Sequence, residues 1–365
     1  MKKVLTYLRQ NPISILLLAL PLAIAAEALH GSPTLIFALA AVAIIPLANY
    51  IGQATESLAH YTGPRVGGLL NATLGNAAEL IITIVAIREG LLELVKASIT
   101  GSILGNLLLV LGLSVLLGGL RHGTQTFHRR QASSNAILLV LTVVILMVPS
   151  LFSHYIGDIE HFDPKVEALS MGVAAIMIIL YALGLIFSFK SPEVVESPLT
   201  LDVSDPAISH QAWPLKVSLL VLGLSTVGVA YMSEVLVGAV EPLVEMLGIS
   251  EFFIGIIFIP IIGNVAEHLV AVQMAMKNKM TLSVEIAVSS SLQIALFVAP
   301  VLVFISYFMG NPLTLVFNQL ELLALIAGVL IAALASSDGE SNWLEGAELL
   351  AIYVILALAF VLMPG

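Results

Sequence analysis

Two short segments of this chain repeat one pattern of small and polar residues inside long apolar stretches. The first is GNAAE at 75–79 and the second is GNVAE at 263–267, 188 positions later. A charged side chain in the middle of a membrane costs at least ~3 kcal/mol, so a carboxylate there indicates a functional site. We therefore expect Glu79 and Glu267 to bind a cation or protons between two related halves of a transporter.

Polar neighbours of the two glutamates supply further oxygen atoms. Within each motif, Asn and Glu are three residues apart and share one helix face, and the glycines allow helices to approach closely. A second polar stripe follows each motif. The candidate cation ligands beside the glutamates are Gly75, Asn76, Ser102, Asn106, Gly263, Asn264, Ser290 and Gln293, with Ser98 and Ser291 in the same stripes. Oxygen ligands suit a hard cation such as Ca²⁺, and the chain has no Cys for softer metals.

Simpler interpretations of these residues stay open. A buried Glu also serves as a hydrogen-bonding group between helices, and Gly and Ser also serve only in helix packing. His268 follows Glu267, whereas Leu80 takes its place after the first motif. We interpret His268 as a proton-coupling or gate residue, with a neutral packing histidine as the alternative. A zinc site is disfavoured because no HExxH motif is present.

The composition places these motifs in a membrane protein. Of the 365 residues, 59% are hydrophobic and only 10% are charged, against roughly 25% charged in soluble domains. The net charge of −10 and the lack of a basic patch argue against nucleic-acid binding. We expect an all-α polytopic membrane protein, and not an enzyme, because no nucleophile–base arrangement is evident.

Apolar stretches of about 20 residues predict membrane-spanning helices. We expect eleven, at 12–30, 34–58, 66–87, 95–118, 132–152, 166–189, 214–239, 252–276, 281–308, 313–335 and 342–362. We interpret the first as a helix that stays in the membrane rather than as a cleaved signal peptide.

The basic residues predict the orientation. With the N-terminus in the cytoplasm, 11 of the 14 Lys and Arg fall at cytoplasmic ends of the expected spans, and Arg88, Lys96 and Lys165 fall at outer ends. A miscount by one span would remove this bias. We expect a multi-pass protein of the plasma (inner) membrane, surrounded by lipid, with homo-oligomerisation left open.

The two motifs belong to a longer repeat. Between 66–116 and 254–304, 11 of 51 aligned positions are identical, and they include Ser102 with Ser290. The two segments are five crossings apart, an odd number, so they run in opposite directions, as in the inverted repeats of secondary transporters. We expect an N-terminal helix in 1–32, five-helix repeats at 33–190 and 214–365, and an acidic cytoplasmic linker at 191–213.

The motifs resemble those of cation/proton exchangers (the CAX family) of the Ca²⁺/cation antiporter superfamily, over nearly the whole chain. Further segments that carry the resemblance are KAS at 96–98 leading into GSILGN at 101–106, Gln125 and Phe127, and SSDGESNWLEG at 336–346. The long N-terminal tail of plant members is missing, so we expect the prokaryotic type.

The resemblance implies exchange of cytosolic Ca²⁺ for external H⁺ through Glu79 and Glu267, with the polar candidates above as flanking ligands and with no cofactor. Asn106 aligns with Ile294, and this asymmetry argues for proton rather than Na⁺ coupling. Glu56 and Glu234, which we place near cytoplasmic ends of the second and seventh spans, resemble an acidic vestibule. Asp338 is expected at the same mouth, with ordinary solvated charges as the alternative.

Charge neutralisation suggests how such exchange would be coupled. Two protons or one Ca²⁺ would each neutralise the glutamate pair, whereas an empty, doubly charged site is poorly tolerated in a low-dielectric interior. We hypothesise that only loaded states interconvert, by alternating access around a fixed site. A Na⁺-coupled exchanger, and a channel or intramembrane enzyme, are the competing hypotheses.

Overall fold

The computed structural model describes residues 12–157, 163–190 and 212–363. In this part of the chain, eight helices are long and apolar enough to cross a membrane, and two shorter apolar helices lie at Ile13–Ala28 and Gln319–Ala335. The expectation of a helical, multi-pass membrane protein is therefore confirmed. The expected acidic linker at 191–213 falls almost entirely outside the described residues.

The elements follow one another in two series. The first series is η1 (Pro12–Leu18), α2 (Ala19–Ala28), α3 (Pro33–Leu74), α4 (Ala77–Arg88), α5 (Leu92–Leu104), η2 (Gly105–Val110), α6 (Leu111–His122), β1 (Gln125–Thr126), α7 (Arg129–Ile156) and α8 (Pro164–Lys190). The second series is α9 (Leu215–Gly238), α10 (Val240–Leu247), α11 (Glu251–Phe253), η3 (Ile254–Phe258), α12 (Ile259–Met276), α13 (Met280–Gln293), η4 (Ile294–Val298), α14 (Ala299–Met309), α15 (Gln319–Ala335), β2 (Glu340–Ser341) and α16 (Trp343–Val361). The short antiparallel pair of β1 and β2 is a departure from the expected all-α chain.

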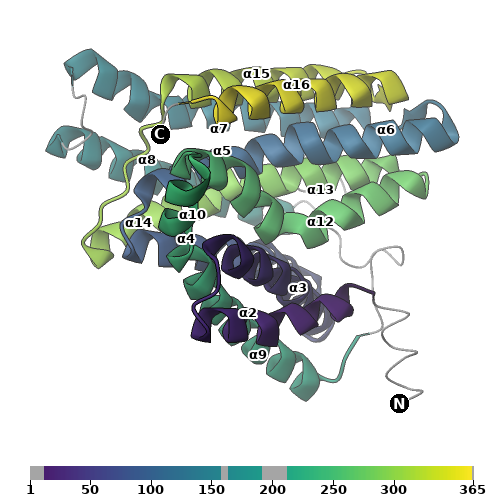
Figure 1. Cartoon of the computed structure of the whole chain (residues 1–365). Helices are drawn as coiled ribbons and strands as arrows, with labels where there is room; N and C mark the ends of the chain where they lie inside the picture. The colour runs from purple at the N-terminus through teal and green to yellow at the C-terminus, as the bar shows by residue number, and fades with distance from the viewer. Residues whose placement is uncertain (1–11, 158–162, 191–211, 364–365) are drawn as a thin grey trace.

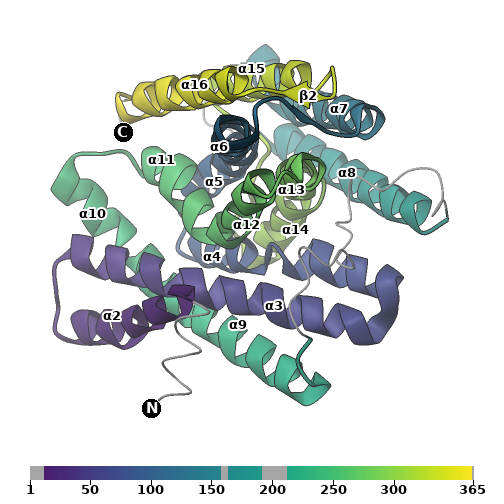
Figure 2. The same ribbon diagram turned by 90° about the vertical axis from the view of Figure 1, so that its right-hand side faces the viewer.

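The helices form three groups (Figures 1 and 2). Helices α2, α3 and α9 lie together on one side, and α7, α15 and α16 lie on the opposite side. Between them lie α4, α5, α6, α12, α13 and α14, with α8 beside α14. The central helices carry both motifs and both polar stripes. They are also more enclosed by protein. In an 18-residue apolar stretch of Leu92–His122, 72% is buried, whereas in the corresponding stretch of Trp343–Val361 only 17% is buried.

One sharp reversal divides α3 into two segments. At Gly63, φ is 82°, which glycine adopts far more readily than other residues. The chain folds back there, so that Gly67 packs against Ala59, and a Cβ added at Gly67 would lie 2.6 Å from the Ala59 Cβ. The reversal separates the expected spans at 34–58 and 66–87.

The two motif helices differ in their backbones. The first breaks at Gly75 and Asn76, and α4 begins at Ala77, whereas α12 runs without a break through the second motif. The expectation of one continuous helix over 66–87 is therefore wrong. A motif of the same sequence pattern is a helix end in one half and a helix interior in the other.

The expected span at 313–335 is wrong at its start, because α15 begins only at Gln319. Asn318 caps this helix: its Oδ1 accepts from the Glu321 N–H at 2.9 Å, and the Glu321 carboxylate accepts from the Asn318 N–H at 2.8 Å. The non-helical segment before it is held by serine hydroxyls, which accept from the backbone N–H groups of Leu313, Leu315 and Phe317. Side chains of the protein thus satisfy backbone groups that water cannot reach.

Two π-helical turns occupy matching places in the two series. η2 covers Gly105–Val110 and η4 covers Ile294–Val298, and a shift of 188 moves 105–110 onto 293–298. Such turns are rare and often lie at functional sites. Each directly follows the helix that carries a polar stripe, and Asn106, the last polar residue of the first stripe, lies within η2.

Candidate functional site

The two motif helices cross at their glycines. A Cβ added at Gly75 would lie 3.3 Å from Oε1 of Glu267, and a Cβ added at Gly263 would lie 3.4 Å from the Cβ of Glu79. Each glycine therefore lies against the glutamate of the other motif. This reciprocal contact brings two carboxylates that are 188 positions apart in sequence to one crossing point.

Helix α5 supplies a hydroxyl group to the first glutamate. Ser102 Oγ donates to Oε1 of Glu79, which is only 1% exposed. Asn264 Nδ2, from α12, lies 3.4 Å from Ser102 Oγ and 3.2 Å from the Pro260 carbonyl oxygen. Side chains of α4, α5 and α12 thus meet around one carboxylate.

A second set of contacts surrounds the other glutamate. Ser290 hydrogen-bonds to Glu267 and accepts from Asn106 Nδ2 at 3.0 Å. Asn106 Oδ1 lies 3.0 Å from Nε2 of His268, and because an amide oxygen only accepts, this nitrogen carries the hydrogen. The contacts link His268 to Glu267 through Asn106 and Ser290.

The remaining two amide residues also meet. Asn76 Nδ2 donates to Gln293 Oε1 at 2.7 Å, across the two halves of the chain. All ten candidate ligands of the sequence analysis therefore take part in this one cluster, through side-chain contacts or through the two glycines. Neither motif forms the cluster alone: each glutamate is hydrogen-bonded by a serine of its own half, and the contacts of the glycines, Asn106, Asn264 and Gln293 join the two halves.

The cluster presents oxygen atoms without partners. Within the described residues, Oε2 of Glu79 and Oε2 of Glu267 are buried and accept no hydrogen bond. Leaving such atoms unpaired is costly, and a proton or a cation would satisfy them. In the same part of the chain no three His, Cys, Asp or Glu side chains gather as a metal site. A cation here would depend on amide and hydroxyl oxygens beside two carboxylates, which is the ligand chemistry of Ca²⁺.

The expected grouping of Glu56 with Glu234 at one mouth is wrong. Ser57, the neighbour of Glu56, accepts from the Trp213 N–H at 3.2 Å, just before α9 begins. Glu234 lies near the other end of α9 and pairs with Arg88 at 2.9 Å. At about 1.5 Å per residue, the helix between these positions spans roughly 28 Å. A helix that begins on one side of a membrane ends on the other, and the sequence interpretation overlooked this for Glu234.

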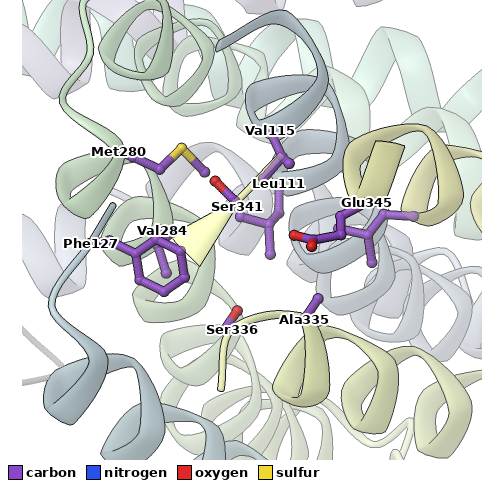
Figure 3. A pocket seen from close by; sticks show the side chains of 10 residues that line it. Leu111, Val115, Phe127, Met280, Val284, Ala335, Ser336, Ser341 and Glu345 are labelled. Atoms are coloured by element: carbon purple, nitrogen blue, oxygen red, sulfur yellow. The ribbon is translucent and has the colours of Figure 1, made fainter. Parts of the chain in front are cut away.

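Asp338 lies in the turn before β2, where its side chain accepts from the Glu340 N–H at 3.1 Å. Figure 3 shows the neighbouring pocket, in which Ser336, Ser341 and Glu345 lie among apolar side chains. Its volume of about 10 Å³ is close to the minimum for one water molecule. No candidate ligand lines this pocket, so Glu345, its one acidic lining residue, lies apart from the candidate site.

The sequence interpretation missed the buried carboxylate of Glu321. Glu321 is 1% exposed and accepts from Thr100 Oγ1 at 3.1 Å. A signal was available, because Asn318 and Glu321 have the spacing of a helix capping box within an expected membrane span. A capping box there indicates both a late helix start and a buried acid.

Known proteins resemble this chain over nearly its whole length. The family described as sodium/calcium exchanger protein matches residues 32–190 and 217–362. The Ca²⁺/H⁺ antiporter ChaA of Bacillus subtilis is 46% identical over 356 residues, covering 97% of this chain and 100% of the relative. A Ca²⁺/H⁺ antiporter of Aphanothece halophytica is 45% identical over 359 residues, covering 96% of each. The structure of native YfkE is similar with a TM-score of 0.82 at 44% identity, and the match covers 96% of this chain and 100% of that one.

Proposed function

This chain belongs to the sodium/calcium exchanger protein family, and we propose that it exchanges cytosolic Ca²⁺ for external H⁺. The two relatives described above are Ca²⁺/H⁺ antiporters, which are transporters and not enzymes in the usual sense. The observation that carries the proposal is the reciprocal crossing, with Gly75 against Glu267 and Gly263 against Glu79. It provides one place where two carboxylates can share a divalent cation.

Glu79 and Glu267 are the groups that bind Ca²⁺ or protons in this proposal. The amide and hydroxyl oxygens of the cluster complete the Ca²⁺ ligands, and the two unpaired carboxylate oxygens are where the cargo binds. Protons and Ca²⁺ compete because either neutralises the pair, and a charged empty site is unfavourable in a low-dielectric interior. His268 takes part in proton coupling, which its hydrogen-bonded path to Glu267 supports.

Alternating access is proposed to come from two inverted five-helix repeats, at 33–190 and 214–365, around this site. We count eleven spans in this proposal, from the eight long helices, the two shorter ones and the broken helix that contains the first motif. The paired π-helical turns η2 and η4 support the repeat. The helix within 1–32 stands outside it, and the acidic segment at 191–213 joins the halves.

The proposed orientation places the N-terminus in the cytoplasm of a cell with this protein in its plasma membrane. Contacts at one end of the bundle support the placement of most Lys and Arg residues on the cytoplasmic side. His122 lies 2.9 Å from the Met276 carbonyl oxygen, so the basic residues Arg121 and Lys277 share one end. Arg88 lies at the far end of α9, beside Glu234.

The test uses purified protein in liposomes with a proton gradient and no Na⁺. Radioactive calcium uptake and a pH-sensitive dye are followed together. We expect Ca²⁺ to accumulate while the proton gradient collapses, and each flux to need the other ion. Glu79→Gln serves as the inactive variant, and Glu241→Gln, an exposed position in α10, serves as its matched control. Flux that requires Na⁺ would instead assign the chain to sodium-coupled exchange, and no flux with either ion would contradict both.

A further inference from the structure

A second buried polar cluster lies behind α5, on the side away from the candidate site. Its centre is Glu321, in the first turn of α15. One carboxylate oxygen accepts from the Asn318 N–H at 2.8 Å and closes the capping box. The other accepts from Thr100 Oγ1 at 3.1 Å. One carboxylate therefore both caps α15 and holds α5.

A buried lysine adds charge to this attachment. Lys96, one turn before Thr100, is 6% exposed and forms an ion pair with Glu93. Its charge also acts on Glu321 and on Glu251, and Glu251 accepts from the Leu94 N–H at 3.0 Å. A buried ammonium group needs such partners to offset its lost hydration. The three carboxylates come from α5, α11 and α15, so they fix the start of α5 to two other elements.

Thr100 and Ser102 point in opposite directions from α5. They are two residues apart, which is about 200° around the helix axis and about 3 Å along it. Ser102 donates to Glu79 in the candidate site, and Thr100 donates to Glu321 behind the helix. At this level α5 is held between two carboxylates, one on each face.

We propose that Glu321 is a positioning residue for cation binding, because its bond to Thr100 sets the rotation of α5 about its own axis. Side-chain atoms lie about 5 Å from a helix axis, so a rotation of 10° moves them by about 0.9 Å. Ca²⁺–oxygen distances cover only about 2.3–2.6 Å. A small rotation of α5 therefore removes Ser102 and Asn106 from a Ca²⁺ ion without unfolding the helix. The predicted effect on Ca²⁺ affinity rests on the proposed function. The effect of the Thr100 bond on the rotation of α5 does not depend on what the protein transports.

Four variants separate this role from simple helix capping. Thr100→Val removes the bond to α5 and leaves the capping box intact. Asn318→Ala removes the cap and leaves the Thr100 bond intact. Thr142→Val is the matched control, because the Thr142 hydroxyl is equally buried but donates only within α7, to the Leu138 carbonyl oxygen. Thr100→Ser restores the hydroxyl and serves as the conservative rescue.

Transport is measured in liposomes as a function of Ca²⁺ concentration, alongside the melting temperature of each variant. Loss of an outer-shell partner costs about 10–100-fold in metal affinity, so we expect Thr100→Val to raise the KM for Ca²⁺ about tenfold with little change in maximal rate. Thr100→Ser should recover the wild-type KM. Asn318→Ala should lower the melting temperature and leave the KM unchanged. A wild-type KM for Thr100→Val, or an equal rise for Asn318→Ala, would overturn the proposal.

Amide hydrogen exchange keeps the test independent of the cargo. Exchange reports local opening of a helix, so Thr100→Val should speed exchange in α5 and η2, and Thr142→Val should not. If the wild-type protein exchanges no Ca²⁺ for H⁺, the proposed function fails while this measurement still decides the positioning role. Unchanged exchange in α5 for Thr100→Val would overturn it.

Discussion

Gly75→Ala tests the crossing of the two motifs most directly. At Gly75, φ is −56°, which any residue adopts, so the substitution tests space and not backbone freedom. The new Cβ would lie 2.6 Å from the Asn71 carbonyl oxygen and 3.3 Å from Oε1 of Glu267. The first distance is 0.8 Å short of the 3.4 Å at which ordinary contact begins. Because the obstructing atom belongs to the backbone, it cannot rotate away.

The break between α3 and α4 must therefore shift by several tenths of an ångström, and Asn76 and Glu79 shift with it. Overpacking of this kind costs about 1–3 kcal/mol of folding free energy. Misplacing a functional group by 1 Å costs up to about 100-fold in rate. We expect Gly75→Ala to lower Ca²⁺-dependent proton movement in liposomes about 10–100-fold, with a small fall in melting temperature.

The second motif supplies the control. A Cβ at Gly263 would lie 3.4 Å from the Glu79 Cβ, an ordinary contact, and α12 is unbroken there. Gly263→Ala should therefore keep activity within about threefold, since alanine is the better helix former. Gly52→Ala, where a Cβ would meet nothing within 4 Å, should behave as wild type. Wild-type transport by Gly75→Ala, or an equal loss in Gly263→Ala, would refute the reasoning.

Three further predictions concern the candidate site and its packing. Glu79→Gln and Glu267→Gln should each abolish Ca²⁺-dependent proton movement while the protein still elutes as a folded species; full exchange by both would end the proposed mechanism. Ser102→Ala should raise the KM for Ca²⁺ about tenfold or more, whereas Ser291→Ala, which loses only a bond within its own helix, should leave the KM unchanged. Gly101→Ala would press a Cβ into the Ile256 carbonyl oxygen and should lower the free energy of unfolding by about 1–3 kcal/mol, seen as a lower melting temperature.

Hydrophobicity and the motif spacing predicted the helices and the candidate ligands from sequence. Apolar stretches of membrane length leave few alternatives to helices, because unpaired backbone groups are excluded from lipid. The repeat between the halves predicted that Glu79 and Glu267 meet, and their glycines lie at the crossing. A repeated polar residue inside an apolar helix is informative because it is costly there.

Features that depend on single backbone positions were not predictable in the same way. The late start of α15 lies inside apolar sequence, where hydrophobicity is the same for a helix and for a non-helical segment held by serine hydroxyls. The reversal at Gly63, in contrast, falls in the polar gap between the expected spans at 34–58 and 66–87, so the sequence indicated an interruption there. The error over Glu234 was of another kind. A vestibule was assigned from resemblance, although counting one crossing of α9 separates Glu234 from Glu56.

The two motifs, nearly identical in sequence, are unequal in structure, and this inequality matters for exchange. Glu79 lies in the first turn of α4, just after the break, where the helix dipole stabilises negative charge. Glu267 lies in the interior of α12, where the dipole gives no such help, and its residue is less completely buried. The pair is therefore not a symmetric clamp.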